Sequence, residues 1–127
     1  PDFLLVISYN PGYQSVLKDL KHSTRQRFVT IEFDYPPRDK EAQIIAHESG
    51  VGIDKAMQLA KLGEKVRHLK ASGLEEGVST RLLIYAGQLI RQGVPANRAC
   101  VVAVSRSLTD DVESQRAMDD LAQAIFA

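Results

Sequence analysis

The sequence predicts a mostly α-helical fold with a short β portion at its beginning. Its 127 residues include 44% hydrophobic and 25% charged side chains, a composition typical of folded globular proteins. Two apolar runs, at 3–9 and 28–33, have the pattern of strands, whereas the apolar residues that follow Pro37 recur at helical spacing. We therefore expect a strand-helix-strand portion over residues 1–37 and an all-α portion over residues 38–127.

The first portion is built around two expected strands. Phe3–Ile7 is a dense apolar run of the kind that forms a strand covered on both faces, and it leads to the turn signal Asn10-Pro11-Gly12. Helical spacing predicts a short helix over 14–22, and a polar connection then leads to the strand at 28–33. Such a buried strand needs neighbouring strands, and the first residue is Pro1 rather than Met. We interpret the chain as the C-terminal fragment of a longer protein.

The second portion is a succession of amphipathic helices separated by glycine and proline. Ala42, Ile44, Ile45 and Ala46 form the expected buried side of the first helix. The expected helices are 39–49 with Asp39 as N-cap and Gly50 as terminator, 53–69 with Gly63 as a weak point, 80–90 capped by Ser79 or Thr80 and followed by Gly93, 95–108 with Pro95 in its first turn, and 111–126.

Charge and cysteine content narrow the possible partners. Sixteen Lys and Arg balance 16 Asp and Glu, so the net charge of zero argues against nucleic-acid and anionic-membrane partners. Cys100 has no disulfide partner within the chain, which favours a reducing, cytoplasmic location. No apolar run is long enough to predict membrane insertion. The chain contains no G-x-x-x-x-G-K-[ST] phosphate loop, and its scattered histidines predict no metal site.

Four polar residues are candidates for chemistry on phosphate groups. Asn10 follows an apolar strand, at the sheet edge where α/β proteins bind ligands, and its amide suits the positioning of an attacking water; it also suits the turn itself. Arg25 and Arg27 precede the next strand, and a planar guanidinium suits phosphate, although both also fit a solvated surface. Arg81 lies in the first turn of a helix, where a cation opposes the helix dipole unless an anion is nearby.

Two consecutive helices also permit another interpretation. The helices at 80–90 and 95–107, with Arg98 and Arg106 on them, have the order of a helix-turn-helix. Antiparallel helix pairs in bundles give the same pattern. A non-catalytic helical interaction domain, with DNA binding as a special case, is therefore the alternative function.

The motifs taken in order resemble the C-terminal part of an AAA+ ATPase of the MoxR branch, in the CbbQ/NirQ/NorQ/GvpN group. Residues 4–11 resemble the sensor 1 segment, and residues 20–28 resemble the arginine-finger segment, with Gln26 where related proteins commonly have Asp. Residues 77–81 resemble the entry to the lid helix that carries sensor 2, with Thr80 in place of Pro. The part that begins at Tyr35-Pro36-Pro37 resembles the C-terminal domain of this group.

The resemblance implies a function for the full-length protein and roles for these residues. ATP and Mg²⁺ would be held mainly by an upstream core, with Asn10 orienting the water, Arg81 contacting phosphate, and Arg27, or Arg25 in its place, acting on the neighbouring subunit's site. The family expectation is a ring, usually a hexamer, that remodels a client metalloenzyme such as nitric oxide reductase or Rubisco with a von Willebrand A-domain partner. The fragment alone is expected to be inactive.

Overall fold

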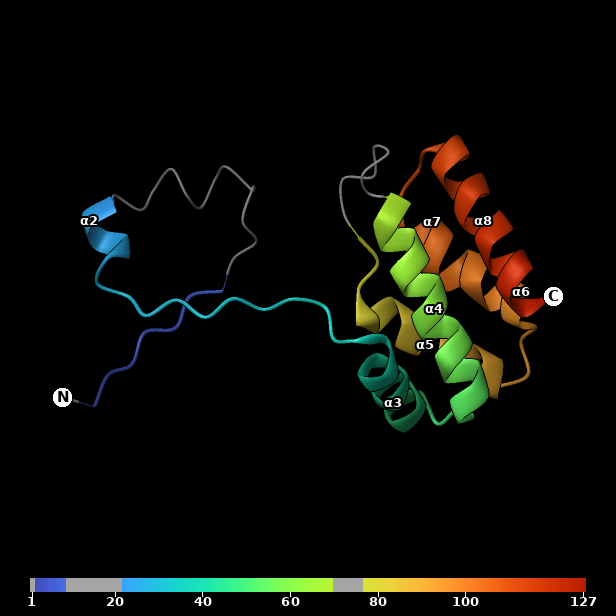
Figure 1. The fold of residues 1–127 in the computed structure, drawn as a ribbon, viewed down its shortest axis with the longest axis horizontal. Helices are drawn as coiled ribbons and strands as arrows, with labels where there is room; N and C mark the ends of the chain where they lie inside the picture. The colour runs from blue at the N-terminus through green and yellow to red at the C-terminus, as the bar shows by residue number, and fades with distance from the viewer. Residues whose placement is uncertain (1, 9–21, 70–76) are drawn as a thin grey trace. The chain divides into compact units, whose positions relative to one another are not determined.

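The computed structural model describes residues 2–8, 22–69 and 77–127. The chain divides into two units, Pro1–Asp34 and Tyr35–Ala127. In Figure 1 the second unit is the group of packed helices α3 to α8.

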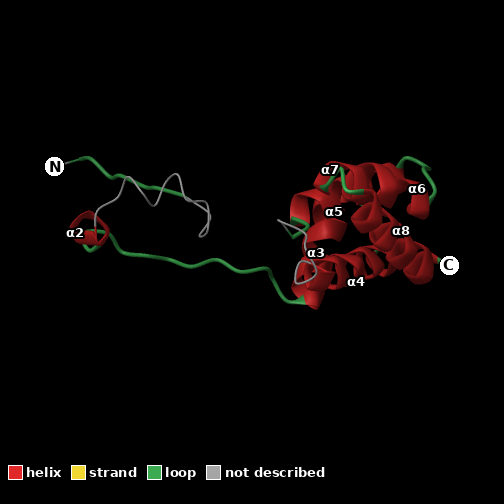
Figure 2. Cartoon of the chain, turned by 90° about the horizontal axis from the view of Figure 1, so that it is seen from above, coloured by secondary structure: helices red, strands yellow, loops and turns green. Residues whose placement is uncertain are grey.

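The first unit has one short helix, α2 (His22–Arg25), followed by a turn in which Phe28 N–H donates to Arg25 O at 3.1 Å. The two expected strands are not formed within the described residues, which Figure 2 shows as helix and loop only. A strand exists only by pairing with a neighbour, and the apolar side chains of both segments are exposed, to 84% at Phe3 and 91% at Phe33. Of the helix expected over 14–22, only His22 lies within the described residues.

The second unit consists of helices that all contribute to one core. α3 packs against α4 and α5, α4 also packs against α5 and α8, and α5 and α8 both contact the segment from α6 to the π-helical turn η2. The elements are α3 (Arg38–Ser49), α4 (Ile53–Leu69), α5 (Thr80–Arg91), α6 (Ala96–Cys100), η2 (Val101–Ser105), α7 (Arg106–Leu108) and α8 (Val112–Phe126).

The predicted ends of α3 and α5 are confirmed in detail. Gly50 adopts the left-handed conformation, with φ of 76°, and donates its N–H to Ala46 O at 2.9 Å. Ser79 is the N-cap of α5, and its Oγ accepts a hydrogen bond from Leu82 N–H at 3.4 Å. Gly93 follows α5 with φ of 97°, which an L-residue with a side chain rarely adopts.

The start and the buried face of α3 differ from the expectation. Pro37, not Asp39, precedes the helix; its carbonyl accepts from Glu41 N–H at 2.9 Å, and its ring fixes φ at −55°. Asp39 lies in the first turn, where a carboxylate interacts favourably with the helix dipole. Ala42 and Ile45 are fully buried as expected, but Ile44 is 36% exposed and Glu41 is buried in its place.

The helix expected over 95–108 is interrupted. Pro95 is the N-cap of α6 rather than a member of its first turn. The chain then forms η2, in which the N–H of Arg106 donates to Val101 O five residues earlier. The widened turn buries Ser105, whose hydroxyl donates to Asp119 on α8, and Arg106 also pairs with Asp119 at 3.2 Å. Contact with α8 therefore accompanies the departure from regular helix.

The core lies between α3, α4, α5 and α8. Gly63 on α4 allows α5 to come close, because a Cβ atom built there would lie 2.6 Å from Leu83 Cδ1. The residue that the sequence marks as a weak point is thus a packing position. The largest fully buried apolar side chains are Ile45, Leu59, Leu62, Val66, Val78, Leu83, Val104 and Met118.

Candidate functional site

The candidate site is the segment that leads into α5, residues 77–81, which we call the α5 entry. Val78 is fully buried, Ser79 caps the helix, and Thr80 is its first residue. Arg81 lies in the first turn with its side chain exposed, and that turn contains no acidic residue. The α5 entry therefore combines an anchored backbone with an accessible cation.

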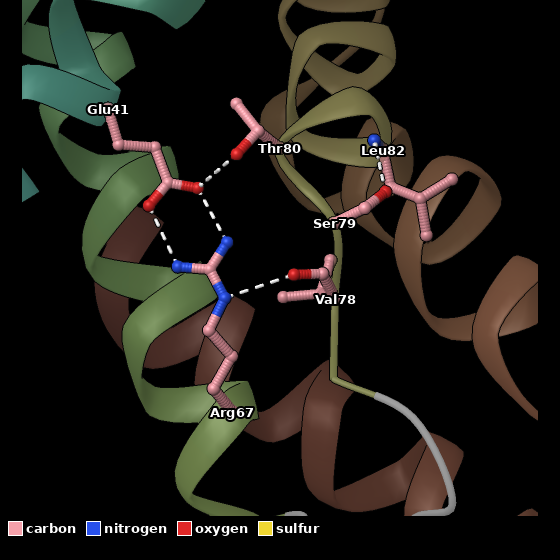
Figure 3. Close-up of polar contacts among 6 residues, drawn as sticks. All are labelled: Glu41, Arg67, Val78, Ser79, Thr80 and Leu82. Carbon is pink, nitrogen blue, oxygen red and sulfur yellow. Dashed lines mark hydrogen bonds and ion pairs between the residues drawn. The ribbon is translucent and has the colours of Figure 1, made fainter. Parts of the chain in front are cut away.

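An ion pair beside the α5 entry joins α3 to α4. Arg67 on α4 donates from Nη2 to Oε1 of Glu41 at 2.6 Å and from Nη1 to Oε2 at 2.8 Å (Figure 3). The side chains are 12% and 1% exposed for Arg67 and Glu41 respectively, so the pair is largely removed from water. Two parallel charge-assisted bonds of this kind fix the guanidinium in both position and orientation.

The same two side chains hold the α5 entry. Arg67 Nε donates to the carbonyl oxygen of Val78 at 3.0 Å, and Thr80 Oγ1 donates to Glu41 Oε1 at 3.1 Å. Figure 3 shows these bonds converging from α4 and α3 on the chain immediately before α5. The backbone before Arg81 and the side chain beside it are therefore fixed by groups on two other helices.

Tyr35 covers the guanidinium of this cluster. Arg67 Cζ lies 3.7 Å from the centroid of the Tyr35 ring, within the range of a cation–π contact. Gly77 leaves room for this arrangement, because a Cβ atom built on it would lie 2.8 Å from Tyr35 Oη and 3.3 Å from Arg67 Cγ. Tyr35 is the first residue of the helical unit. The side chain of Arg67 therefore contacts both the start of that unit, at Tyr35, and the α5 entry, at Val78.

The charged atoms of Arg67 and Glu41 are all hydrogen-bonded. Every guanidinium nitrogen of Arg67 donates a hydrogen bond, and both oxygens of Glu41 accept one. No buried side-chain nitrogen or oxygen among the described residues lacks a hydrogen-bond partner. The hydrogen bonds of Glu41, Arg67 and Thr80 are thus directed at one another and at the α5 entry, and their role is to hold the entry in place.

Arg81 differs from Arg67 in each of these respects. Its side chain makes no hydrogen bond or ion pair with any residue that the structure describes, and it is exposed. The N–H groups of the first turn carry partial positive charge, so Arg81 and the helix end together favour an anion. A phosphate group is the kind of ligand that this combination suits.

The other predicted site residues lie in the first unit or outside the description. Arg25 ends α2 and Arg27 follows in the adjoining turn, both with exposed side chains. Asn10 lies outside the described residues. Arg25 and Arg27 thus belong to the first unit, and Arg81 belongs to the second.

Sequence reasoning missed the residues that support Arg81. None of Glu41, Arg67 and Tyr35 is predicted as a site residue from the sequence, and they come from three separate segments. One signal was available: Glu41 lies four residues before Ile45, on the face of α3 that is buried. A carboxylate on a buried helix face requires a cationic partner.

Other features of the described residues add no second candidate. Over the described ranges no group of three or more His, Cys, Asp or Glu side chains is placed to hold a metal ion. A hollow lined by Glu48, Ser49, Gln88, Arg91 and Gln92 lies at the opposite ends of α3 and α5 from the α5 entry. None of the helices described is both long enough and apolar enough to cross a membrane.

Comparison with known proteins gives close relatives. The chain is 54% identical over 126 residues to Protein NorQ of Paracoccus denitrificans, covering 99% of this chain and 47% of that protein. It is 52% identical over 127 residues to Protein CbbQ of Hydrogenophilus thermoluteolus, covering 100% and 48%. It is 50% identical over 121 residues to the denitrification regulatory protein NirQ of Pseudomonas aeruginosa, covering 95% and 46%.

These matches concern part of each relative, because the chain spans about half the length of the curated proteins it matches. The sequence model described as "CbbQ/NirQ/NorQ C-terminal" matches residues 41–125. That range begins at Glu41 and includes Arg67, the α5 entry and nearly all of the helical unit. The expected resemblance is confirmed, and the chain belongs to the CbbQ/NirQ/NorQ C-terminal family.

Proposed function

We propose that this chain is the C-terminal portion of an AAA+ ATPase that activates a metalloenzyme as an ATP-dependent chaperone. The observation that carries the proposal is the α5 entry, where a buried ion pair holds the helix start at Val78 and Thr80, and the adjacent Arg81 is exposed. The anchoring implies that the position of Arg81 matters, and the exposure leaves its charge accessible to a phosphate. Membership of the family supports the same proposal.

The proposed roles divide between the two units. Arg81 contacts a phosphate oxygen of ATP from the helical unit, which acts as a lid. Arg27, with Arg25 as the other candidate, stabilises the charge that develops on the transferred phosphoryl group in a neighbouring subunit. Asn10 orients the attacking water through its amide. A guanidinium that acts across a subunit boundary makes hydrolysis depend on assembly, so the proposed working form is a ring, usually hexameric in this superfamily.

The described residues include a group that could bind a phosphate of ATP, but no group of ligands for Mg²⁺. Arg81 offers the planar, permanently charged fork that suits phosphate. The sequence contains no phosphate loop, and no acidic cluster fit for a metal ion lies among the described residues. The β- and γ-phosphates and the magnesium ion would therefore be held by a core outside these 127 residues, where the ion neutralises charge on the phosphates.

The proposed client and partner come from the family. One relative is named a denitrification regulatory protein, and the family's names group it with CbbQ and NorQ. We propose a client metalloenzyme of the nitric oxide reductase or Rubisco kind, and a von Willebrand A-domain protein as partner. Hydrolysis would move the helical unit, and that movement would be transmitted to the client.

The experiment uses a full-length protein that contains this chain and measures phosphate release. We expect hydrolysis from the full-length protein and none above the buffer control from residues 1–127 alone. Arg27→Ala should abolish hydrolysis while ATP binding stays nearly intact, since an arginine finger is typically worth about 10³–10⁵ in rate.

Mixed assemblies test the action across subunits. Arg27→Ala subunits mixed with subunits disabled in the phosphate loop should regain activity, because each supplies what the other lacks. Mixed rings that assemble but stay inactive would contradict the role in trans. Loss of activity with Arg25→Ala and not with Arg27→Ala would move the role to Arg25.

A further inference from the structure

The contact between Tyr35 and Arg67 suggests how Arg81 is kept in its working position. We propose that Tyr35 and Arg67 are positioning residues for nucleotide binding, acting on ATP only through Arg81. The inference rests on the proposed function, because it assumes that Arg81 contacts the nucleotide. It adds two residues that touch no phosphate themselves but determine where Arg81 stands.

The first step is that Arg67 determines where α5 begins. Its Nε holds the carbonyl of Val78 at 3.0 Å, and its partner Glu41 holds the hydroxyl of Thr80 at 3.1 Å. These contacts lie on the two sides of Ser79, the residue that caps the helix. A shift of the guanidinium would therefore move the first turn of α5, and Arg81 with it.

The second step is that Tyr35 restrains the guanidinium. The hydrogen bonds of Arg67 restrain its guanidinium within the plane of that group, and a contact on its face adds restraint perpendicular to the plane. Tyr35 covers one face at 3.7 Å, and Gly77 of the α5 entry lies near the hydroxyl end of the same side chain, since a Cβ atom built on it would be 2.8 Å from Tyr35 Oη. The Tyr35 side chain therefore lies beside both the residue that holds the α5 entry and the entry itself.

The third step is that Tyr35 stands where the helical unit begins. The polypeptide reaches α3 through Tyr35, Pro36 and Pro37, and the two prolines restrict the backbone between the ring and the helix. The placement of the ring is thus set by the segment that leads into the helical unit. If that segment moves, the Tyr35 ring and the Arg67 guanidinium should move with it, and the start of α5, which carries Arg81, should shift as a result.

The structure supplies a matched control on the same two helices. Arg38 on α3 and Glu64 on α4 form an ion pair with bonds of 2.8 and 2.9 Å. Its partners are 26 positions apart in the sequence, as are Glu41 and Arg67, but the pair is exposed and its two hydrogen bonds join only Arg38 and Glu64. Breaking it removes a link between α3 and α4 without touching the support of Arg81.

The experiment measures ATP affinity of a full-length protein that contains this chain. Tyr35→Leu should weaken binding about three- to tenfold, the range expected for losing a partly desolvated cation–π contact. Arg38→Ala should be neutral, because that exposed ion pair does not hold the α5 entry. Arg67→Lys should weaken binding at least as much as Tyr35→Leu, since an ammonium cannot hold Glu41 and Val78 together.

The decisive comparison adds Tyr35→Leu to Arg81→Ala. If Tyr35 acts through Arg81, the double variant should bind ATP no more weakly than Arg81→Ala alone. Losses that multiply would overturn the inference, and so would wild-type binding by Tyr35→Leu and Arg67→Lys. Wild-type binding by Arg81→Ala would instead overturn the proposed function, so the two failures are distinguishable.

A second readout needs no nucleotide. Hydrogen exchange at the Leu82 amide reports the cap of α5, because that N–H donates to Ser79 Oγ. Exchange should be faster in Tyr35→Leu than in the wild type and unchanged in Arg38→Ala. Equal exchange in all three proteins would show that the ring does not restrain the α5 entry and would overturn the inference.

Discussion

Glu41 and Arg67, which are separated by 26 positions in the sequence, join α3 to α4 through two hydrogen bonds of 2.6 and 2.8 Å. Arg38 and Glu64 join the same helices with the same separation and similar bond lengths. The first pair is buried and supports the α5 entry, whereas both side chains of the second are 41% exposed. Breaking the two ion pairs should therefore change the free energy of unfolding by different amounts, although their bond lengths are similar.

Glu41→Ala should destabilise the chain by about 3–5 kcal/mol, because it leaves Arg67 buried without its counter-charge. Glu64→Ala should change the free energy of unfolding very little, since water screens that pair. Denaturant unfolding of the two variants and the wild type measures both effects. Equal losses in the two variants would contradict the distinction between a buried and a solvated pair.

Gly63→Ala tests whether α4 and α5 touch as closely as the structure shows. Alanine favours a helix over glycine by about 1 kcal/mol. A Cβ atom here would lie 2.6 Å from Leu83 Cδ1, and overpacking a core typically costs about 1–3 kcal/mol. We expect net destabilisation in thermal unfolding.

The second arm of that test removes the obstructing side chain. In a Leu83→Ala background the same glycine substitution should become stabilising, because the added methyl enters vacated space. A Gly63→Ala variant that is already more stable than the wild type would show that the two helices are not in close contact at this point.

Cys100 should resist modification in the folded chain. It is 1% exposed, and burial, with a smaller contribution from the charge of Asp119, raises its pKa to about 12. The thiolate is the reactive form, so alkylation by iodoacetamide at pH 8 should be very slow until the protein is unfolded. Mass spectrometry of the native and denatured protein measures this. Modification at the rate of a free thiol under native conditions would contradict the buried position of Cys100.

The helical part of the fold was largely predictable, for local reasons. The sequence predicts the helix Ile53–Leu69 with the bounds that the structure has. It also predicts Ser79 as the N-cap of α5 and Gly50 as the residue that terminates α3. These features depend on neighbours within a few residues. The π-helical turn at Val101–Ser105 was missed because it is tied to a contact with Asp119, on another helix.

The strands and the support of Arg81 depend on distant partners. An apolar run such as Phe3–Ile7 indicates a strand only if another strand pairs with it, and in the described residues its side chains stay exposed. Arg81 itself was predictable from its conflict with the helix dipole. The position of Glu41 on a buried helix face indicates that it needs a cationic partner, but its contacts with Arg67, and those of Arg67 with Tyr35, exist only after α3, α4 and the α5 entry have packed together.

The central claim is that Arg81 serves the nucleotide and not the fold. An exposed cation in the first turn opposes the helix dipole, so Arg81→Ala should leave the thermal unfolding of residues 1–127 unchanged or slightly raise its midpoint. In a full-length protein that contains this chain, the same substitution should weaken ATP binding about tenfold or more, as expected for losing a charge-assisted contact. Arg81→Lys should restore binding only in part.

The most direct measurement is therefore paired, with the unfolding midpoint of the chain and the ATP affinity of the full-length protein both determined for Arg81→Ala. We predict an unchanged midpoint together with a large loss of affinity. A large fall in the midpoint with unchanged ATP affinity would show that Arg81 is a structural residue, and it would contradict the account.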